Sequence, residues 1–318
     1  MEEQELIGMH ANDLLLFSLN KYAFHLTASE DMLLPSYKSS MFRGGFGRVF
    51  KSLNCVNRIS KDCQTCPIKN SCSYFYIFEE KTYIPMPYII SSEFNDKRKY
   101  SKGEIITFEL TLFGKAREYL PHFIFSFIEL GVSTGLAKKQ YKYKLTQVSG
   151  ETGNIIFDGE KFVNNAFEEN QRDAAKKNTA AAEDNPANTV TLSFKTPLRL
   201  SVKHVLTPAN KINFELIVKA LTSRINAIAK AHCGYDPMLN PVPLIKKAKD
   251  IKIKQNGLVW TDWTRYSNKQ KTQMDFGGLL GDIIFEGDFS DFMPYLNLGQ
   301  KIHIGKNTTF GLGKYLLK

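Results

Sequence analysis

The sequence predicts an α+β protein of two tandem domains, and three observations carry that prediction. Its 318 residues are enough for two domains of ordinary size, each with its own core. The helix and strand patterns of the C-terminal part follow one simple order, which the N-terminal part repeats less cleanly. Residues 161–188, between them, are polar and rich in alanine, as in a linker or a mobile loop. We therefore expect domains over residues 1–160 and 189–318.

The C-terminal domain is predicted to run strand, helix, strand, strand, helix, strand. Residues of high strand propensity occupy 190–205, 257–266 and 283–285, and apolar residues recur at helical spacing over 214–232 and 289–298. A glycine-rich turn then leads into a last strand. This order is that of ferredoxin-like domains, which RNA-recognition domains share.

The N-terminal domain gives the same order less cleanly, with one insertion. Strands are expected over 14–27, 105–113 and 138–148, and helices over 35–50 and 119–130. A cysteine-rich segment interrupts this order after the first helix. We expect a second ferredoxin-like domain that carries the segment as a metal-binding insertion.

Composition limits the classes of partner and compartment. Lys and Arg number 42 against 32 Asp and Glu, a formal net charge of +10. Such an excess favours a polyanion such as nucleic acid, although a solvated basic surface is the simpler alternative. The acidic start Met1–Glu5 lacks the basic region of a signal peptide, and no apolar run reaches the ~18 residues of a membrane span. We expect a cytoplasmic protein with no membrane partner.

The last forty residues contain the most distinctive pattern, a glycine-rich turn over residues 303–315. Its glycines, Gly305, Gly311 and Gly313, would let the backbone come close to a ligand and turn amides toward an anion, and Lys306 and Lys314 add charge. The alternative is a glycine-rich hairpin without a ligand. The turn does not open a helix, which argues against a dinucleotide or nucleoside triphosphate site.

The first predicted helix contains glycines at positions 44, 45 and 47. Each weakens a helix by up to ~1 kcal/mol relative to alanine. Something must therefore approach the helix backbone closely there. The two candidates are a neighbouring element of the same domain and RNA.

Four cysteines, Cys55, Cys63, Cys66 and Cys72, have the spacing C-x7-C-x2-C-x5-C. In a reducing compartment this clustering predicts a metal site, against the alternative of four unligated thiols in a loop. Structural zinc on four thiolates is the first choice. A 4Fe–4S cluster remains the alternative, because residues 63–72 are similar to the cluster loop of endonuclease III-like DNA glycosylases, with one extra residue in the first gap. We expect a structural role away from the chemistry.

Several motifs together resemble the RAMP superfamily, specifically the CRISPR-associated endoribonucleases that process precursor CRISPR RNA. The resemblance touches both domains. Its motifs are Leu34–Ser39, Phe42–Gly47, Phe194–Arg199, Trp260–Ser267, Gly277–Gly281 and His303–Gly313.

The resemblance implies cleavage of repeat RNA without a catalytic metal. The 2′-hydroxyl would attack the adjacent phosphate and leave a 2′,3′-cyclic phosphate and a 5′-hydroxyl. Such a reaction needs a base near the 2′-oxygen, cations on the phosphate and an acid at the leaving oxygen. DNA lacks the attacking hydroxyl and should not be cut. The partner implied is CRISPR repeat RNA, with other subunits of a CRISPR effector complex as further candidates.

The chain departs from the pattern of many relatives, which carry a histidine in or just after the first helix; close relatives have it where this chain has Arg48. His303 is our substitute, ahead of His25. Tyr37 and Lys38 would handle protons or contact phosphate, and Arg43 and Arg48 would stabilise charge. The residues expected to bind RNA are Gly305, Lys306, Asn307, Thr308, Gly311, Gly313, Lys314, Arg265 and Lys269.

Two other functions remain open. Without the helix histidine the chain could be a RAMP subunit that holds guide RNA in an interference complex and does not cleave it. The cysteines alone would also fit an iron–sulfur DNA repair enzyme, which predicts activity on DNA. Cleavage of repeat RNA in the presence of EDTA separates the three.

Overall fold

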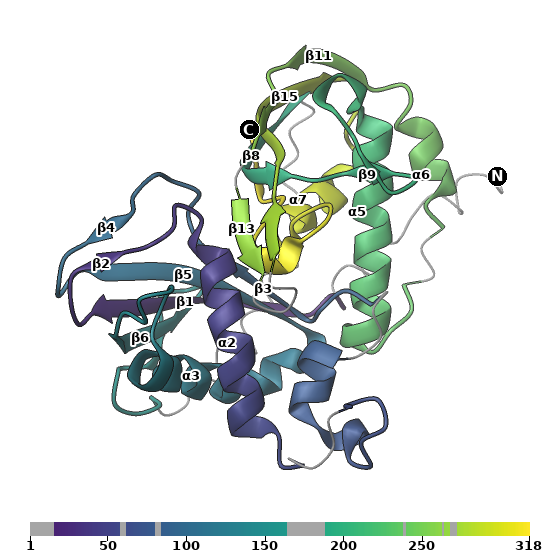
Figure 1. Cartoon of the computed structure of the whole chain (residues 1–318). Helices are drawn as coiled ribbons and strands as arrows, with labels where there is room; N and C mark the ends of the chain where they lie inside the picture. The colour runs from purple at the N-terminus through teal and green to yellow at the C-terminus, as the bar shows by residue number, and fades with distance from the viewer. Residues whose placement is uncertain are drawn as a thin grey trace. The chain divides into compact units, whose positions relative to one another are not determined.

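The chain divides into two compact units, shown in the computed structural model of Figure 1. The N-terminal unit holds Ser18–Ala174 with Ala231–Cys233, and the C-terminal unit holds Met1–Phe17, Ala175–Lys230 and Gly234–Lys318. The structure describes residues 16–57, 62–79, 84–163, 188–237, 240–262, 264–267 and 272–318. Most of the predicted linker, residues 161–188, lies outside these ranges.

The N-terminal unit is built on one antiparallel sheet with the strand order β3-β5-β1-β6-β7. Along β1, every second residue from Tyr22 to Ala28 is buried, so one face of the sheet meets the core. The strands are β1 (Leu19–Ala28), β3 (Tyr88–Ser91), β5 (Ile105–Phe113), β6 (Tyr143–Gly150) and β7 (Ile155–Phe157). A separate short pair joins β2 (Met32–Leu33) to β4 (Lys99–Tyr100).

Two helices cover the buried face of this sheet, α2 (Lys38–Asn54) and α3 (Leu120–Glu129), which lie side by side in Figure 1. Phenylalanine rings fill the space between them. The Phe46 ring stacks on that of Phe123 with centroids 4.7 Å apart, and the Phe42 ring lies 4.7 Å from that of Phe108 on β5. Shorter helical turns are η1 (Lys69–Ser71), η2 (Phe75–Glu79), η3 (Gly114–Tyr119) and η4 (Leu130–Thr134).

The C-terminal unit has its own antiparallel sheet, in the order β11-β15-β8-β16, with β12 also paired to β15. Its strands are β8 (Thr189–Leu198), β11 (Lys252–Asn256), β12 (Val259–Thr261), β15 (Gly278–Glu286) and β16 (Tyr315–Leu317). A further hairpin pairs β13 (Thr264–Ser267) with β14 (Thr272–Asp275).

The helices of this unit are α5 (Phe214–Ile228), α6 (Val242–Lys247) and α7 (Met293–Ile302), with the turns η5 (Ala209–Lys211) and η7 (Thr308–Phe310). The turn η6 (Ala229–Cys233) follows α5 directly, and its last three residues belong to the N-terminal unit. Asn213 caps α5 by accepting a hydrogen bond from the Leu216 amide. The predicted helix 214–232 is α5 continued by the π-helical turn η6. Gly234, in the left-handed conformation, ends that turn. The other predicted helix, 289–298, is shifted: α7 begins at Met293, one residue before Pro294.

Both sheets share one arrangement. If the main strands of each unit are numbered along the chain, their spatial order is second, third, first, fourth. In each unit a helix follows the first strand and another precedes the fourth. The structure is thus a mixed α and β fold with antiparallel sheets. Among the described residues, no helix combines the length and the apolar character that crossing a membrane requires.

A short hairpin corrects the predicted strand 190–205. The strand ends at Leu198, just after Pro197, and the chain then forms β9 (Ser201–Val202) and β10 (Val205–Leu206). The two turn residues, Lys203 and His204, both have positive φ, 48° and 67°. That conformation suits glycine or asparagine in two-residue hairpins, so the hairpin carries backbone strain.

Candidate nucleic-acid interface

The glycine-rich turn is folded back against the end of β8. The Lys306 amide donates to the Arg199 carbonyl oxygen at 2.8 Å, and the Gly313 amide donates to the Pro197 carbonyl oxygen at 3.0 Å. The Thr196 hydroxyl donates to the Gly311 carbonyl oxygen at 2.7 Å and accepts from the Lys314 amide at 2.8 Å. These bonds fix the shape of the turn on the strand.

The glycines of this turn are required by the protein's own backbone. Gly305 has φ +91°, and a Cβ there would lie 2.5 Å from the Arg199 carbonyl oxygen. Gly313 has φ +72°, and its Cβ would lie 1.8 Å from the Ile304 carbonyl oxygen. Any side chain would clash at both positions. Gly305 is half-buried and Gly313 is buried, and the groups that come closest to these two glycines are carbonyl groups of the same unit.

The exposed part of the turn is short and cationic. Lys306 is exposed, Asn307 is half-buried with φ 62°, and Thr308 is buried. Lys314 is half-buried and has interactions within the protein. Of the predicted RNA-binding residues in this turn, Lys306 therefore offers the most accessible charge.

Arg199 is a site residue that the sequence did not single out. Its guanidinium donates to the Gly277 carbonyl oxygen and lies 5.2 Å from the centroid of the Phe276 ring, which in turn contacts Phe310 in the turn. Burial lowers the pKa of Arg199. In the sequence, Arg199 could have been identified as a site residue from its position at the end of the run Phe194–Arg199, one of the motifs that resemble the RAMP superfamily.

His303 lies inside the C-terminal unit, and its role as general base stays a prediction. It follows directly on α7 as the C-cap residue, it is 1% exposed, and its Nδ1 lies 3.2 Å from the Leu312 carbonyl oxygen. In this conformation the ring cannot reach a ribose hydroxyl, because the protein surrounds it. Its position fits a structural role under the turn.

Tyr37 and Lys38 lie at the start of α2. The Tyr37 ring is buried beside Phe94, and burial raises the pKa of its hydroxyl, which disfavours the charged form. The Lys38 ammonium donates to the Ser36 carbonyl oxygen and to Asn95 Oδ1, both at 3.2 Å. Burial lowers the pKa of Lys38, Glu93 opposes that change, and Lys97 adds to it. Lys38 is therefore easier to deprotonate than an ordinary lysine.

The helix glycines separate into two kinds. A Cβ at Gly45 would lie 3.1 Å from Leu130 methyl carbons, and one at Gly47 would lie 3.3 Å from the Phe78 ring. A Cβ at Gly44 would meet nothing within 4 Å. Neighbouring elements thus account for two of the three glycines, and Gly44 faces open space.

Arg48 stands one helical turn after Gly44, on the same face of α2, and is exposed. Arg43 instead points to the protein: its Nη2 donates to Met86 Sδ at 3.4 Å, and it counteracts the rise in pKa that burial gives Tyr88. The strip formed by Gly44 and Arg48 is an open, cationic helix surface where a phosphate chain could lie close to the backbone.

Other predicted RNA-binding residues lie on the β13–β14 hairpin. The backbone of Arg265 pairs with that of Met274, while Lys269 lies outside the described residues. Trp260, in the run Trp260–Ser267, is 40% exposed, and its indole N–H donates to Asp262 at 2.7 Å. A fixed, exposed indole is a surface on which bases can stack.

The four clustered cysteines are half-buried, and none is in a disulfide. Within the described part of the chain, no three His, Cys, Asp or Glu side chains are already grouped as a metal site. The donor set still fits a soft metal, because all four residues can supply thiolates.

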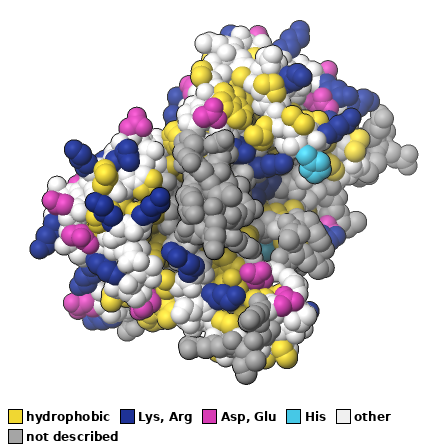
Figure 2. Space-filling model, in the orientation of Figure 1, with side chains coloured by type: hydrophobic (Ala, Val, Ile, Leu, Met, Phe, Trp, Pro, Cys, Tyr) yellow, Lys and Arg dark blue, Asp and Glu magenta, His cyan; other side chains and the backbone are white. Residues whose placement is uncertain are grey.

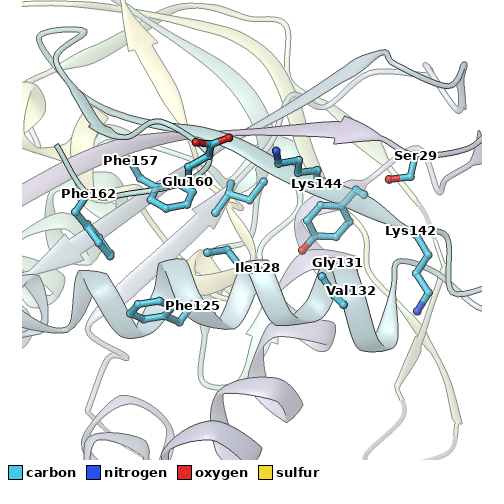
Figure 3. Close-up of a pocket in the computed structure, with 13 residues that line it drawn as sticks. Ser29, Phe125, Ile128, Gly131, Val132, Lys142, Lys144, Phe157, Glu160 and Phe162 are labelled. Atoms are coloured by element: carbon cyan, nitrogen blue, oxygen red, sulfur yellow. The ribbon is translucent and has the colours of Figure 1, made fainter.

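A pocket of about 600 Å³ opens in the N-terminal unit between α3 and the strands β6 and β7 (Figure 3). Its walls are mainly apolar, with Phe125, Ile128 and Phe162 among them, and Lys142 and Lys144 contribute the positive charge. The Tyr143 hydroxyl donates to the Phe127 carbonyl oxygen and is not available to a ligand. The lining also includes one carboxylate, Glu160.

Charge is distributed over both units. Figure 2 shows Lys and Arg side chains on the visible face of each unit, interspersed with fewer Asp and Glu. This distribution agrees with the formal net charge of +10. Positive charge spread in this way would attract a polyanion, but it does not indicate where on the surface the polyanion binds.

Two family models match the chain. The model of CRISPR-associated endoribonuclease Cas6 matches residues 192–315, and a model described as an N-terminal domain matches residues 16–172. An uncharacterised protein of Archaeoglobus fulgidus is 29% identical over 140 residues, which are 42% of this chain and 47% of that protein. The aligned part thus spans about half the length of that relative.

Solved Cas6 structures have a similar fold. A Cas6 of Thermus thermophilus, in its product complex, matches 95% of this chain and 100% of its own with a TM-score of 0.56 and 13% identity. A chain of a partial Cas6-RT-Cas1–Cas2 complex matches 95% of this chain with a TM-score of 0.57 and 15% identity, although the match covers 46% of that longer chain. At such identities, these likenesses show a shared fold.

Proposed function

We propose that this chain, whose residues 192–315 match the Cas6 family model, is a CRISPR-associated endoribonuclease of the Cas6 type. It cleaves precursor CRISPR RNA within the repeat and yields guide RNA. The observation that carries the proposal is the Cas6 match over the C-terminal half, and the fold likeness over 95% of the chain supports it. The shared strand order of the two sheets supports two ferredoxin-like domains.

The proposed reaction uses no catalytic metal. The 2′-oxygen attacks the adjacent phosphorus as its proton passes to a base, and the bond from phosphorus to the 5′-oxygen breaks as that oxygen gains a proton. The products are a 2′,3′-cyclic phosphate and a 5′-hydroxyl. Positioning the 2′-oxygen in line with the leaving oxygen supplies much of the rate.

Lys38 is the proton-handling residue that we favour. Burial lowers its pKa, so a larger share of neutral amine is present near neutral pH than for an exposed lysine. Lys38 is itself 3% exposed, with Tyr37 at 4% and His303 at 1%, so the proposal requires RNA binding to uncover the Lys38 amine. We assign Tyr37 and His303 to holding the start of α2 and the glycine-rich turn in place.

Exposed cations would hold the RNA. Arg48 beside Gly44 and Lys306 on the turn contact phosphates, and Trp260 stacks on a base. Binding through several lysines and arginines should weaken steeply with salt. We also propose a cytoplasmic location and, as partners beyond repeat RNA, other subunits of a CRISPR effector complex.

The first test is cleavage of a repeat RNA in EDTA, beside the same RNA with a single 2′-deoxy substitution at the scissile nucleotide. We expect one cut in the unmodified RNA, a cyclic phosphate at its 3′ end, and no cut in the substituted RNA. Binding without cleavage of either RNA would instead support the non-catalytic RAMP subunit, which the absence of a histidine from α2 and the burial of His303 favour.

The second test concerns Lys38. If its amine accepts the proton, the cleavage rate should rise with pH until the lowered pKa of Lys38 is passed and then level off. Lys38→Arg keeps the positive charge, but a guanidinium stays protonated near neutral pH and cannot accept a proton. The cleavage rate should therefore fall at least about 100-fold, which is the lower end of what a general base usually contributes. His303→Ala should alter the rate mainly through folding, and an intact fold with equal loss would return the role of base to His303.

A further inference from the structure

The segment around the four cysteines has nothing in its own packing to hold it. Among its described residues, 55–57 and 62–73, no side chain is buried, and Val56 is 79% exposed. A stretch without a core needs another source of order, and disulfides or bound metals supply it in such cases. The thiols here are free.

Successive tight turns keep three of the thiols on one short stretch. The Cys66 amide donates to the Cys63 carbonyl oxygen at 3.4 Å, closing the C-x2-C turn. The Lys69 amide donates to the Cys66 carbonyl oxygen at 3.1 Å, and the Cys72 amide to the Lys69 carbonyl oxygen at 3.2 Å. Cys63 and Cys72 both pack against the edge of the core of the N-terminal unit.

Asn57 connects the remaining cysteine to this stretch. The Cys55 thiol lies 3.3 Å from the Asn57 carbonyl oxygen, and the Asn57 side-chain amide lies 3.5 Å from Cys66 Sγ. The two ends of the C-x7-C-x2-C-x5-C pattern therefore lie in the same neighbourhood.

We propose that Cys55, Cys63, Cys66 and Cys72 bind one metal centre through four thiolates. Zinc and an iron–sulfur cluster share this ligand chemistry. Because the thiols are not yet grouped as a site in the described structure, binding must draw them together by local adjustment of the segment after α2. The centre would fasten that segment to the core edge through Cys63 and Cys72, and it takes no part in RNA cleavage.

The test measures the metal in the full chain, purified both in air and under exclusion of oxygen. Elemental analysis should find about one zinc per chain, or about four irons together with visible absorbance in the oxygen-free sample. Either result supports the centre and identifies it. Zinc and iron both near background in the two preparations would overturn the proposal.

Thiol reactivity on the same wild-type sample avoids dependence on variants that fail to fold. With a thiol reagent, four thiols should react slowly and release the metal as they do so, while a chelator should make them react at once. Cys233→Ser is the matched control, because its thiol faces the Ser18 carbonyl oxygen and lies outside the cluster. It should keep the full metal content, whereas Cys66→Ser should lose most of it. Equal reactivity of all five thiols with no metal released would contradict the proposal.

Discussion

Two glycine clusters look alike in the sequence and differ in what comes close to them. In α2, Gly45 and Gly47 face the side chains of other elements, which can shift. In the C-terminal turn, Gly305 and Gly313 face the backbone carbonyl oxygens of Arg199 and Ile304, and they do so at positive φ. A glycine run therefore reports close approach, but it does not say whether a ligand, a side chain or the backbone approaches.

The largest expected effect is that of Gly313→Ala. Its Cβ would overlap the Ile304 carbonyl oxygen, at a φ that alanine disfavours. We expect the free energy of unfolding of the C-terminal unit to fall by roughly 3 kcal/mol, the sum of overpacking and backbone strain. Urea denaturation followed by tryptophan fluorescence measures it, because both tryptophans belong to this unit.

Gly234→Ala is the matched control for that variant. Gly234 has φ +78° in the same unit, and a Cβ there meets nothing within 4 Å. Gly234→Ala should lower the free energy of unfolding by roughly 1 kcal/mol, because it adds backbone strain at positive φ without a steric clash. Equal losses in the two variants would show that the carbonyl contact is not the cause, and the comparison would fail.

A smaller effect is expected for Gly45→Ala. The new methyl would press on Leu130, which costs more than the gain in helix propensity, so the free energy of unfolding should fall by about 1 kcal/mol. Leu130→Val makes room at that contact. In thermal unfolding, the double variant should lose less than the two single variants added together, and strict additivity would exclude the contact.

The smallest effect separates stability from binding at Gly44. Gly44→Ala adds a methyl in open space, so helix propensity alone should raise the free energy of unfolding by up to ~1 kcal/mol. If RNA passes over this strip, its affinity should fall about threefold, on the order of 0.6 kcal/mol. If the Gly44→Ala variant binds RNA with unchanged affinity in a filter-binding titration, RNA does not contact the backbone of α2 at Gly44.

Local patterns predicted most of the fold. The order of strands and helices followed from alternation and helical spacing, which neighbouring residues determine. The ends of elements were less accurate, since α7 starts later than its apolar residues indicate and β8 stops after Pro197. Those ends depend on tertiary contacts such as the pairing of β8 with both β15 and β16.

The surroundings of the candidate site residues could not be predicted from the sequence. His303 was chosen for its closeness to Gly305 in the sequence, yet α7 extends up to it and buries its ring. Arg199 was overlooked because its role comes from a ring and a carbonyl group more than seventy residues away, at Phe276 and Gly277. Burial and long-range contact are properties of the folded chain, and no local pattern contains them.

The hairpin of β9 and β10 has a practical consequence for work on this protein. Lys203 and His204 occupy a bend whose geometry Asn-Gly adopts without penalty. Exchanging the pair for Asn-Gly is thus a route to a more heat-resistant sample for crystallisation.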